Sequence, residues 1–236
     1  MPRGRNCWPL LLLVFPLLVC AQNITITART AVGHDGGRSR GAGNVVVWLT
    51  PADSSDSSFG QAMRRARLTQ HNKSFEPHVV VVPVGSVVEF PNHDPFFHNV
   101  FSLFEGKRFD LGLYEAGTTR DVHFDKPGIS YIFCNIHPEM SAVVLAVETP
   151  YFGISDQRGQ VVIPNVPSGR YILHVWYEAA LPETLSALAR DVTVSETAST
   201  LGLLRLTEVV LPQTHKNLYR RDYEPPAPDN PVYQHR

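Results

Sequence analysis

The residues best suited to chemistry lie in one short segment near the middle of the chain. Cys134, His137 and Met140 follow one another in a C-x2-H-x2-M pattern, and His98 lies upstream, just after two phenylalanines. Apolar stretches flank the segment, so a loop between two strands would gather a thiolate, an imidazole and a thioether around one point. His98 heads a further apolar stretch and supplies a second imidazole. This combination of residue types predicts a metal site.

The same four side chains also indicate which metal the site would hold. Two histidine nitrogens, one thiolate and a weak axial methionine form the ligand set of a blue-copper electron-transfer site. Four protein ligands leave no open position for a substrate, so we expect electron transfer and no enzyme activity. Zinc is the main competitor, but methionine is a poor zinc ligand and structural zinc sites usually have more thiolates. A nucleophilic Cys–His pair is less favoured, because the motif shows neither a glycine-rich oxyanion loop nor an orienting acid.

The start of the chain, residues 1–21, has the pattern of an export signal. Arg3 and Arg5 precede a short apolar run, and Ala21 ends a small-residue cleavage site, so we expect cleavage after Ala21. The run is too short to span a bilayer comfortably. We therefore expect a periplasmic or otherwise exported protein with no transmembrane span after signal removal. A lipid anchor on Cys20 is the less favoured alternative, because a valine precedes that cysteine.

The cysteine count supports a metal role for the thiol. The chain has three cysteines, Cys7, Cys20 and Cys134, and the first two lie in the predicted signal. An exported protein that keeps only Cys134 cannot form an internal disulfide, and a bare thiol is a liability in an oxidising compartment. A lone thiol there needs an explanation, and metal ligation is one.

Composition and patterning predict an all-β fold. Valine is abundant, glycine and proline recur, and long helical periodicity is absent. Regular short strands separated by turns favour a β-sandwich. In the middle of the chain the expected strands cover residues 79–83, 85–90, 98–102, 118–124, 131–134 and 141–147. The formal net charge of −1 gives no indication of a nucleic-acid partner.

Two stretches of this middle part resemble the plastocyanin/amicyanin group of cupredoxins. They are FEPHVVVVPVGSVVEFPNHDPFFHNVFS at 75–102 and GISYIFCNIHPEM at 128–140. The resemblance implies a Greek-key cupredoxin sandwich over residues 62–149. It also implies one type 1 copper ion, for which the ligands would be His98, Cys134, His137 and Met140.

The resemblance further implies how such a site would work. Asn99 would tie the two ligand loops together by hydrogen bonds, and Asn135 is expected to support the ligands as well. Electrons would pass through the edge of His137, inside an apolar collar that includes the docking residues Phe96, Phe97 and Pro138. The implied function is single-electron transfer between periplasmic redox partners, such as a c-type cytochrome or a periplasmic dehydrogenase. The alternative is a copper-binding accessory or surface-scaffold protein that does not shuttle electrons.

The flanking regions resemble a carboxypeptidase-regulatory-like (transthyretin-like) β-sandwich. Residues 22–50 resemble its beginning, and residues 151–208, with ISDQRGQVVIPNVPSGRYILHVW, resemble its second half. We therefore expect a second, smaller sandwich into which the copper domain is inserted, in preference to three sequential β units. The proline-rich tail, residues 213–236, is expected to be disordered. The remaining histidines considered are expected to have no metal role: His71, His78, His93, His123, His174 and His215.

Overall fold

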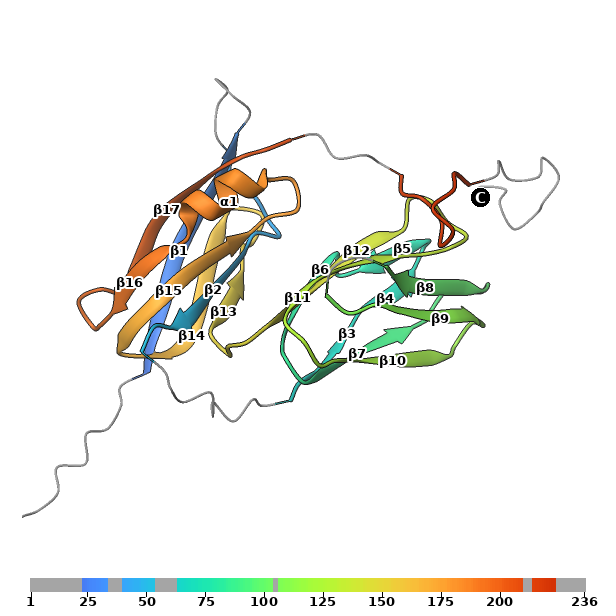
Figure 1. Cartoon of the computed structure of the whole chain (residues 1–236), viewed down its shortest axis with the longest axis horizontal. Coiled ribbons are helices and arrows are strands. Elements are labelled where there is room, and N and C mark those ends of the chain that lie inside the picture. Colours follow the sequence, from blue (N-terminus) through green and yellow to red (C-terminus); the bar gives the residue numbers. More distant parts are fainter. Residues whose placement is uncertain (1–22, 34–39, 54–62, 104–105, 210–213, 224–236) are drawn as a thin grey trace, which may run out of the picture.

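The computed structural model describes residues 23–33, 40–53, 63–103, 106–209 and 214–223. Within these ranges the chain forms seventeen strands and one short helix, α1 (Pro182–Leu188). The strands build two β-sandwiches that lie side by side (Figure 1), so the all-β prediction is confirmed. In the described part of the chain, no helix is long and apolar enough to cross a membrane. The predicted signal lies outside the described residues.

The first of these units, the outer sandwich, is built from both ends of the chain. Its two sheets have the strand orders β14-β1-β17 and β13-β2-β15-β16. Its strands are β1 (Asn23–Gly33), β2 (Val46–Pro51), β13 (Phe152–Ile154), β14 (Gln160–Pro167), β15 (Gly169–Trp176), β16 (Arg190–Val194) and β17 (Thr200–Thr207). Exposed and buried residues alternate along β1, as expected for a strand with one face on a core.

The second unit, the inner sandwich, is built from the middle of the chain. Its sheets have the orders β10-β7-β3 and β6-β12-β11-β8-β9, and β4 and β5 form a separate hairpin. Its strands are β3 (Arg65–Arg67), β4 (Thr69–His71), β5 (Ser74–Glu76), β6 (Val79–Pro83), β7 (Ser86–Pro91), β8 (His98–Ser102), β9 (Phe109–Tyr114), β10 (Thr119–Phe124), β11 (Gly128–Phe133) and β12 (Ser141–Val147). The strands of the outer sandwich thus precede and follow those of the inner sandwich in the sequence. The insertion, the domain bounds and the carboxypeptidase-regulatory-like identity of the outer sandwich stay predictions.

Strands β6 and β12 join the two sandwiches, because both of their faces are buried. On β12, Val144 packs into the core of the inner sandwich, while its neighbours Val143 and Leu145 pack against Val46 and Trp176 of the outer sandwich. Strand side chains alternate between the two faces of a sheet, so a strand buried on both faces is apolar throughout. This explains the unbroken apolar sequence of β12.

Three features of the inner sandwich and the tail differ from the sequence-based expectation. Strands β3, β4 and β5 are three residues long, too short to show a pattern. Strand β9 is a largely exposed edge strand that contains Gly112, and this masks its alternation. The prediction of a disordered tail from residue 213 is wrong for residues 214–223, which hydrogen-bond to the inner sandwich. Residue 213 and residues 224–236 lie outside the described part.

Candidate metal centre

Three of the four predicted ligands belong to one tight loop between β11 and β12. Strand β11 ends at Phe133, and Cys134 is the next residue. The backbone N–H of Cys134 donates to the carbonyl of Met140 at 3.3 Å, and the N–H of Met140 donates to the carbonyl of His137 at 3.1 Å. Because Phe133 pairs with Ser141 across the two strands, the ends of the loop are held together. The loop therefore has little freedom to separate its ligands.

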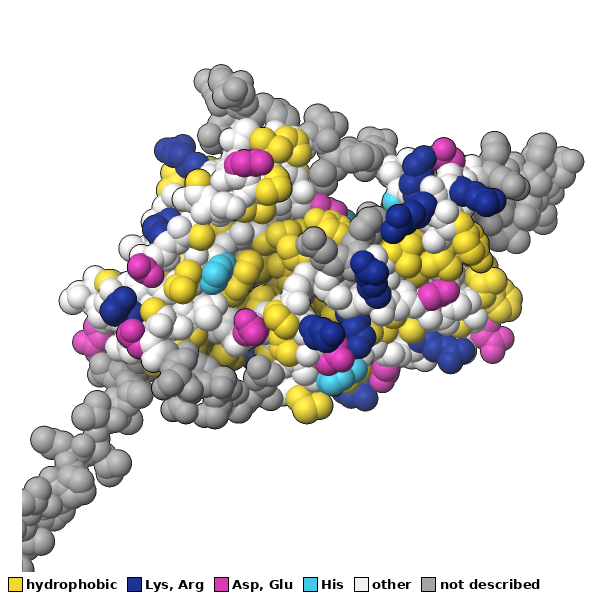
Figure 2. All heavy atoms as spheres, in the orientation of Figure 1, with side chains coloured by type: hydrophobic (Ala, Val, Ile, Leu, Met, Phe, Trp, Pro, Cys, Tyr) yellow, Lys and Arg dark blue, Asp and Glu magenta, His cyan; other side chains and the backbone are white. Residues whose placement is uncertain are grey.

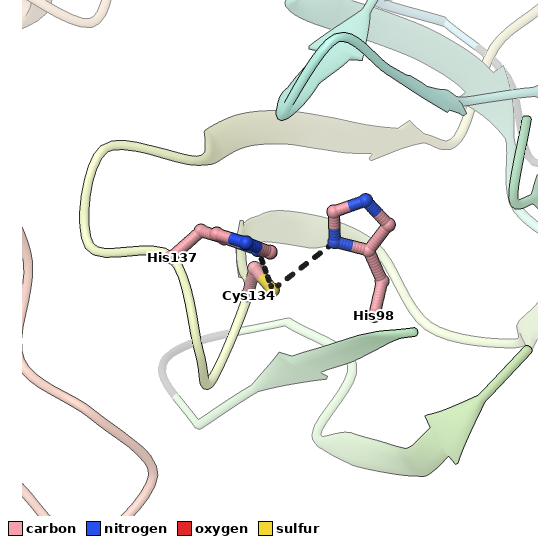
Figure 3. A group of neighbouring side chains, drawn as sticks. All are labelled: His98, Cys134 and His137. Atoms are coloured by element: carbon pink, nitrogen blue, oxygen red, sulfur yellow. Dashed lines mark hydrogen bonds between the residues drawn. The ribbon is translucent and has the colours of Figure 1, made fainter. Parts of the chain in front are cut away.

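The fourth predicted ligand, His98, reaches the loop from the first residue of β8. Strand β8 pairs with β11 through Phe101 and Phe133, which places His98 beside the loop. The Nδ1 atom of His98 lies 3.7 Å from the Sγ atom of Cys134, and the Nδ1 atom of His137 lies 3.4 Å from it (Figure 3). The three candidate donor atoms all lie within 4.8 Å of one another. Residues separated by 36 positions in the sequence thus converge on one point.

These distances fit donors arranged around a single ion. Metal–nitrogen bonds of about 2.0–2.1 Å and metal–sulfur bonds of about 2.3 Å, typical of protein zinc sites, would separate nitrogen from sulfur by about 3.5–3.8 Å at angles between tetrahedral and trigonal. The observed separation from Cys134 Sγ is 3.7 Å for Nδ1 of His98, within this range, and 3.4 Å for Nδ1 of His137, just below it. Such distances suit zinc as well as copper, so the ligand chemistry must distinguish the two. Met140 is 1% exposed and ends the same loop, which favours the copper set.

The site is closed to solvent. Cys134 and His98 are 0% exposed, and His137 is 5% exposed. Burial raises the pKa of the Cys134 thiol, and backbone hydrogen bonds from Asn99, Ile136 and His137 oppose that rise. The backbone N–H groups that face this sulfur are suited to stabilise the negative charge of a thiolate ligand.

Both predicted histidine ligands have a lowered pKa, which favours the neutral imidazole. The pKa of His137 is lowered to about 4, mainly by burial and also by nearby His98 and Lys73, while Asp94 opposes the shift. Burial also lowers the pKa of His98, although the hydrogen bond and charge of Asp94 act in the opposite direction. A neutral imidazole has a free lone pair, which metal ligation requires.

Asp94 supports the site, and sequence reasoning did not identify it. Its Oδ2 atom accepts a hydrogen bond from Nε2 of His98 at 2.7 Å, and both side chains are buried. A histidine that donates its outer N–H to a carboxylate keeps its other nitrogen for the metal, which is the usual arrangement in metal sites. The only sequence signal was a carboxylate four residues before a ligand histidine, which is uninformative without the loop conformation.

The loop before β8 positions Asp94 through the backbone. The N–H groups of Asn72 and Lys73 donate to its two carboxylate oxygens at 2.6 and 2.9 Å. Asn92 accepts from the N–H of Asp94 at 3.0 Å and donates to the carbonyl of Phe96 at 2.8 Å. Burial would raise the pKa of Asp94, but the hydrogen bonds it accepts outweigh this effect and hold the pKa below its ordinary value.

The two asparagines expected to support the ligands make different contacts. The backbone N–H of Asn99 is among those that lower the pKa of Cys134, while its side-chain Nδ2 donates to Asp110 on β9 at 2.7 Å. Asn135 faces the C-terminal segment, where its Oδ1 atom accepts from the N–H of Leu218 at 2.7 Å.

The predicted docking residues lie at different depths. The ring of Phe96 packs against both imidazoles, with centroids 5.2 Å from His98 and 5.7 Å from His137. Phe97 is 56% exposed. Pro138 is partly buried, and its carbonyl accepts from the N–H of His215 at 3.2 Å. Phe97 therefore offers the open apolar surface, and the C-terminal segment contacts the Pro138 side.

Comparisons with known proteins found similar solved structures only. No family model matches the chain, and no curated protein matches its sequence. Among solved structures, the Cu-containing nitrite reductase (NirK) from Thermus scotoductus SA-01 is 27% identical with a TM-score of 0.35, and the match covers 36% of this chain and 23% of that one. The novel purple cupredoxin from Nitrosopumilus maritimus is 22% identical with a TM-score of 0.32, over 35% of this chain and 99% of that one. A reduced mutant of amicyanin is 17% identical with a TM-score of 0.33, over 42% of this chain and 91% of that one.

The site itself has the composition of a type 1 copper centre. The donors of His98, Cys134 and His137 are clustered, and Met140 lies in the same loop. This set combines soft sulfur ligands with imidazoles in a buried environment. Part of the chain is thus similar to cupredoxins and carries a donor set typical of type 1 copper.

Proposed function

We propose that this chain is an exported type 1 copper protein that carries single electrons between redox partners. The observation that supports this most directly is the buried convergence of His98 and His137, each with Nδ1 facing the sulfur of Cys134. Copper held by such a ligand set supplies one-electron exchange between Cu(I) and Cu(II). His98, Cys134, His137 and Met140 would hold the ion, and they leave no position for a substrate.

The surrounding residues suit this task because they restrain the ligands. Asp94 fixes the ring of His98, and the backbone bonds of Cys134 and Met140 close the ligand loop. Ligands held in this way change position little when the charge of the site changes, and burial excludes water from them. Both properties favour electron exchange over ligand exchange.

Phe96 and Phe97 provide the expected contact with a partner. The ring of Phe96 packs against both imidazoles, and the exposed ring of Phe97 adjoins it in the sequence. A small apolar patch of this kind suits brief docking over a limited area. The partner proposed is a c-type cytochrome or a periplasmic dehydrogenase.

The replacement Cys134→Ser tests the assignment of the centre. Addition of Cu(II) to the purified wild-type protein should give an intense visible charge-transfer band and a type 1 EPR spectrum, and the variant should lose both. A variant that keeps the band would show that the site is misassigned. Wild-type protein that takes up zinc but gives no band with copper would favour the zinc alternative.

Electron transfer is tested separately from copper binding. The copper-loaded protein, mixed with a reduced soluble c-type cytochrome, should be reduced, and it should be reoxidised by an added oxidant over repeated cycles. A protein that shows the copper band but does not cycle would support the accessory or scaffold alternative.

A further inference from the structure

The described C-terminal segment, residues 214–223, which we call the strap, lies against the inner sandwich. The preceding strand, β17, belongs to the outer sandwich, and the N–H of Val209 still donates to Ala179 there at 2.7 Å. The strap contacts the metal-ligand loop of the inner sandwich, and in Figure 1 it lies at the end of that sandwich. The outer sandwich therefore contributes its C-terminal extension to the surroundings of the site.

Three hydrogen bonds attach the strap to the ligand loop. The hydroxyl of Tyr223 donates to the carbonyl of Cys134 at 2.7 Å. The N–H of Leu218 donates to Oδ1 of Asn135 at 2.7 Å, and the N–H of His215 donates to the carbonyl of Pro138 at 3.2 Å. The strap is thus bonded to a ligand residue and to two residues that flank the ligand His137.

Aromatic packing reinforces this attachment. The ring of His215 stacks on Phe133, with centroids 4.3 Å apart and an interplanar angle of 30°. Tyr223 meets His215 edge-on at 5.5 Å. Because Phe133 immediately precedes Cys134, this stack lies against the strand end that carries the thiol.

The strap also has internal structure of its own. Oδ1 of Asn217 accepts from the N–H groups of Tyr219 and Arg221 at 2.9 and 3.0 Å, and the N–H of Asn217 donates to the carbonyl of Arg221 at 2.9 Å. A segment that is already folded loses less conformational entropy when it binds a surface. The hydroxyl of Tyr223 is protonated at neutral pH and can donate, because the ordinary pKa of tyrosine is about 10 and burial raises it further.

We infer that the strap is a positioning element for the metal-ligand loop, in which Tyr223 acts through Cys134. The hydroxyl of Tyr223 points its hydrogen, the positive end of the O–H dipole, at the backbone carbonyl of Cys134. The reduced centre carries one positive charge fewer than the oxidised centre, so such a dipole favours the reduced state. This inference rests on the proposed copper function. It assigns to the strap an effect on the reduction potential in addition to any effect on stability.

The test compares Tyr223→Phe with Tyr219→Phe in the copper-loaded full chain. Tyr219 lies in the same strap but is 72% exposed, so it is a matched control. We expect the reduction potential of Tyr223→Phe to fall below that of the wild type, while that of Tyr219→Phe stays at the wild-type value. Equal potentials in both variants, with the copper band intact, would overturn the inference.

A second readout does not require the metal. Cys134 is the free cysteine in the described part of the chain, and it is buried. A thiol reagent can therefore react with it only when the loop opens. The rate of this reaction is measured in the metal-free protein prepared without residues 1–21. Loss of one hydrogen bond should raise the rate by roughly two- to tenfold in Tyr223→Phe, and truncation after residue 213 should raise it further. An unchanged rate in the truncated chain would overturn the inference. Failure of the copper function alone would show as a missing band in the wild type, with the thiol rates still responding.

Discussion

Replacement of Asp94 by asparagine is the sharpest test of how the first ligand histidine is held. The carboxylate is 4% exposed and accepts three hydrogen bonds, from the N–H groups of Asn72 and Lys73 and from Nε2 of His98. Asparagine has nearly the same shape but offers one oxygen and one NH₂ group in place of two oxygens. At least one of the three donors must therefore face another donor.

The cost of this change can be worked from those contacts. The best placement keeps the oxygen at the Lys73 and His98 side and turns the NH₂ group toward Asn72, which leaves the partly buried N–H of Asn72 without its acceptor, at about 1 kcal/mol or more. The two bonds that remain lose the charge of their acceptor, at about 0.5–1.5 kcal/mol each. Removal of a buried charge recovers part of this, because burial is the largest single influence on the pKa of Asp94. We expect a net loss in the free energy of unfolding of about 2 kcal/mol.

Denaturant unfolding of the metal-free protein at pH 7 measures this loss, with Asp191→Asn as the control because Asp191 is exposed on β16. Copper affinity, measured by competition with a chelator, should fall by about 10- to 100-fold in Asp94→Asn, since residues that orient a ligand histidine have effects of this size. A variant that matches the Asp191→Asn control in both stability and affinity would refute the reasoning.

Two further predictions concern the docking surface and the junction between the sandwiches. Phe97→Ala should slow reduction of the copper site by the cytochrome and leave the copper band unchanged. Leu203→Ala, which changes an exposed apolar side chain on the outer sandwich, should leave the reduction rate at the wild-type value. Equal reduction rates in the two variants would exclude Phe97 from the docking surface. Both ring nitrogens of His78 face acceptors, Glu178 at 2.6 Å and the carbonyl of Ser141 at 3.2 Å, and the hydrogen bond to Glu178 is the main reason that the pKa of His78 is raised. A raised folded-state pKa gives stability that is complete below the unfolded value of about 6.5 and is lost as pH rises through the folded value. Glu178→Gln should therefore lower the free energy of unfolding at pH 5.5 by at most about 1 kcal/mol, because the pair is partly exposed. Denaturant unfolding at pH 9 should show a smaller loss. An equal loss at both pH values would contradict this.

Local patterns in the sequence were sufficient for the centre of the site. Cys134, His137 and Met140 lie within one loop, so their spacing alone places them together, and the apolar runs of β8 and β12 match the structure residue for residue. The type of metal also follows from the sequence, because the chemistry of the donors determines it. The export signal and the partner stay predictions.

Only the tertiary structure showed what surrounds that centre. Asp94 supports His98 because backbone groups of Asn72 and Lys73 orient its carboxylate, and no residue pattern encodes that loop conformation. The strap was predicted to be disordered because it is polar and poor in aliphatic residues, yet Tyr223 bonds to a carbonyl 89 positions away. Short-range patterns report the neighbours of a residue along the chain, whereas these contacts depend on where the chain returns after both sandwiches have packed together.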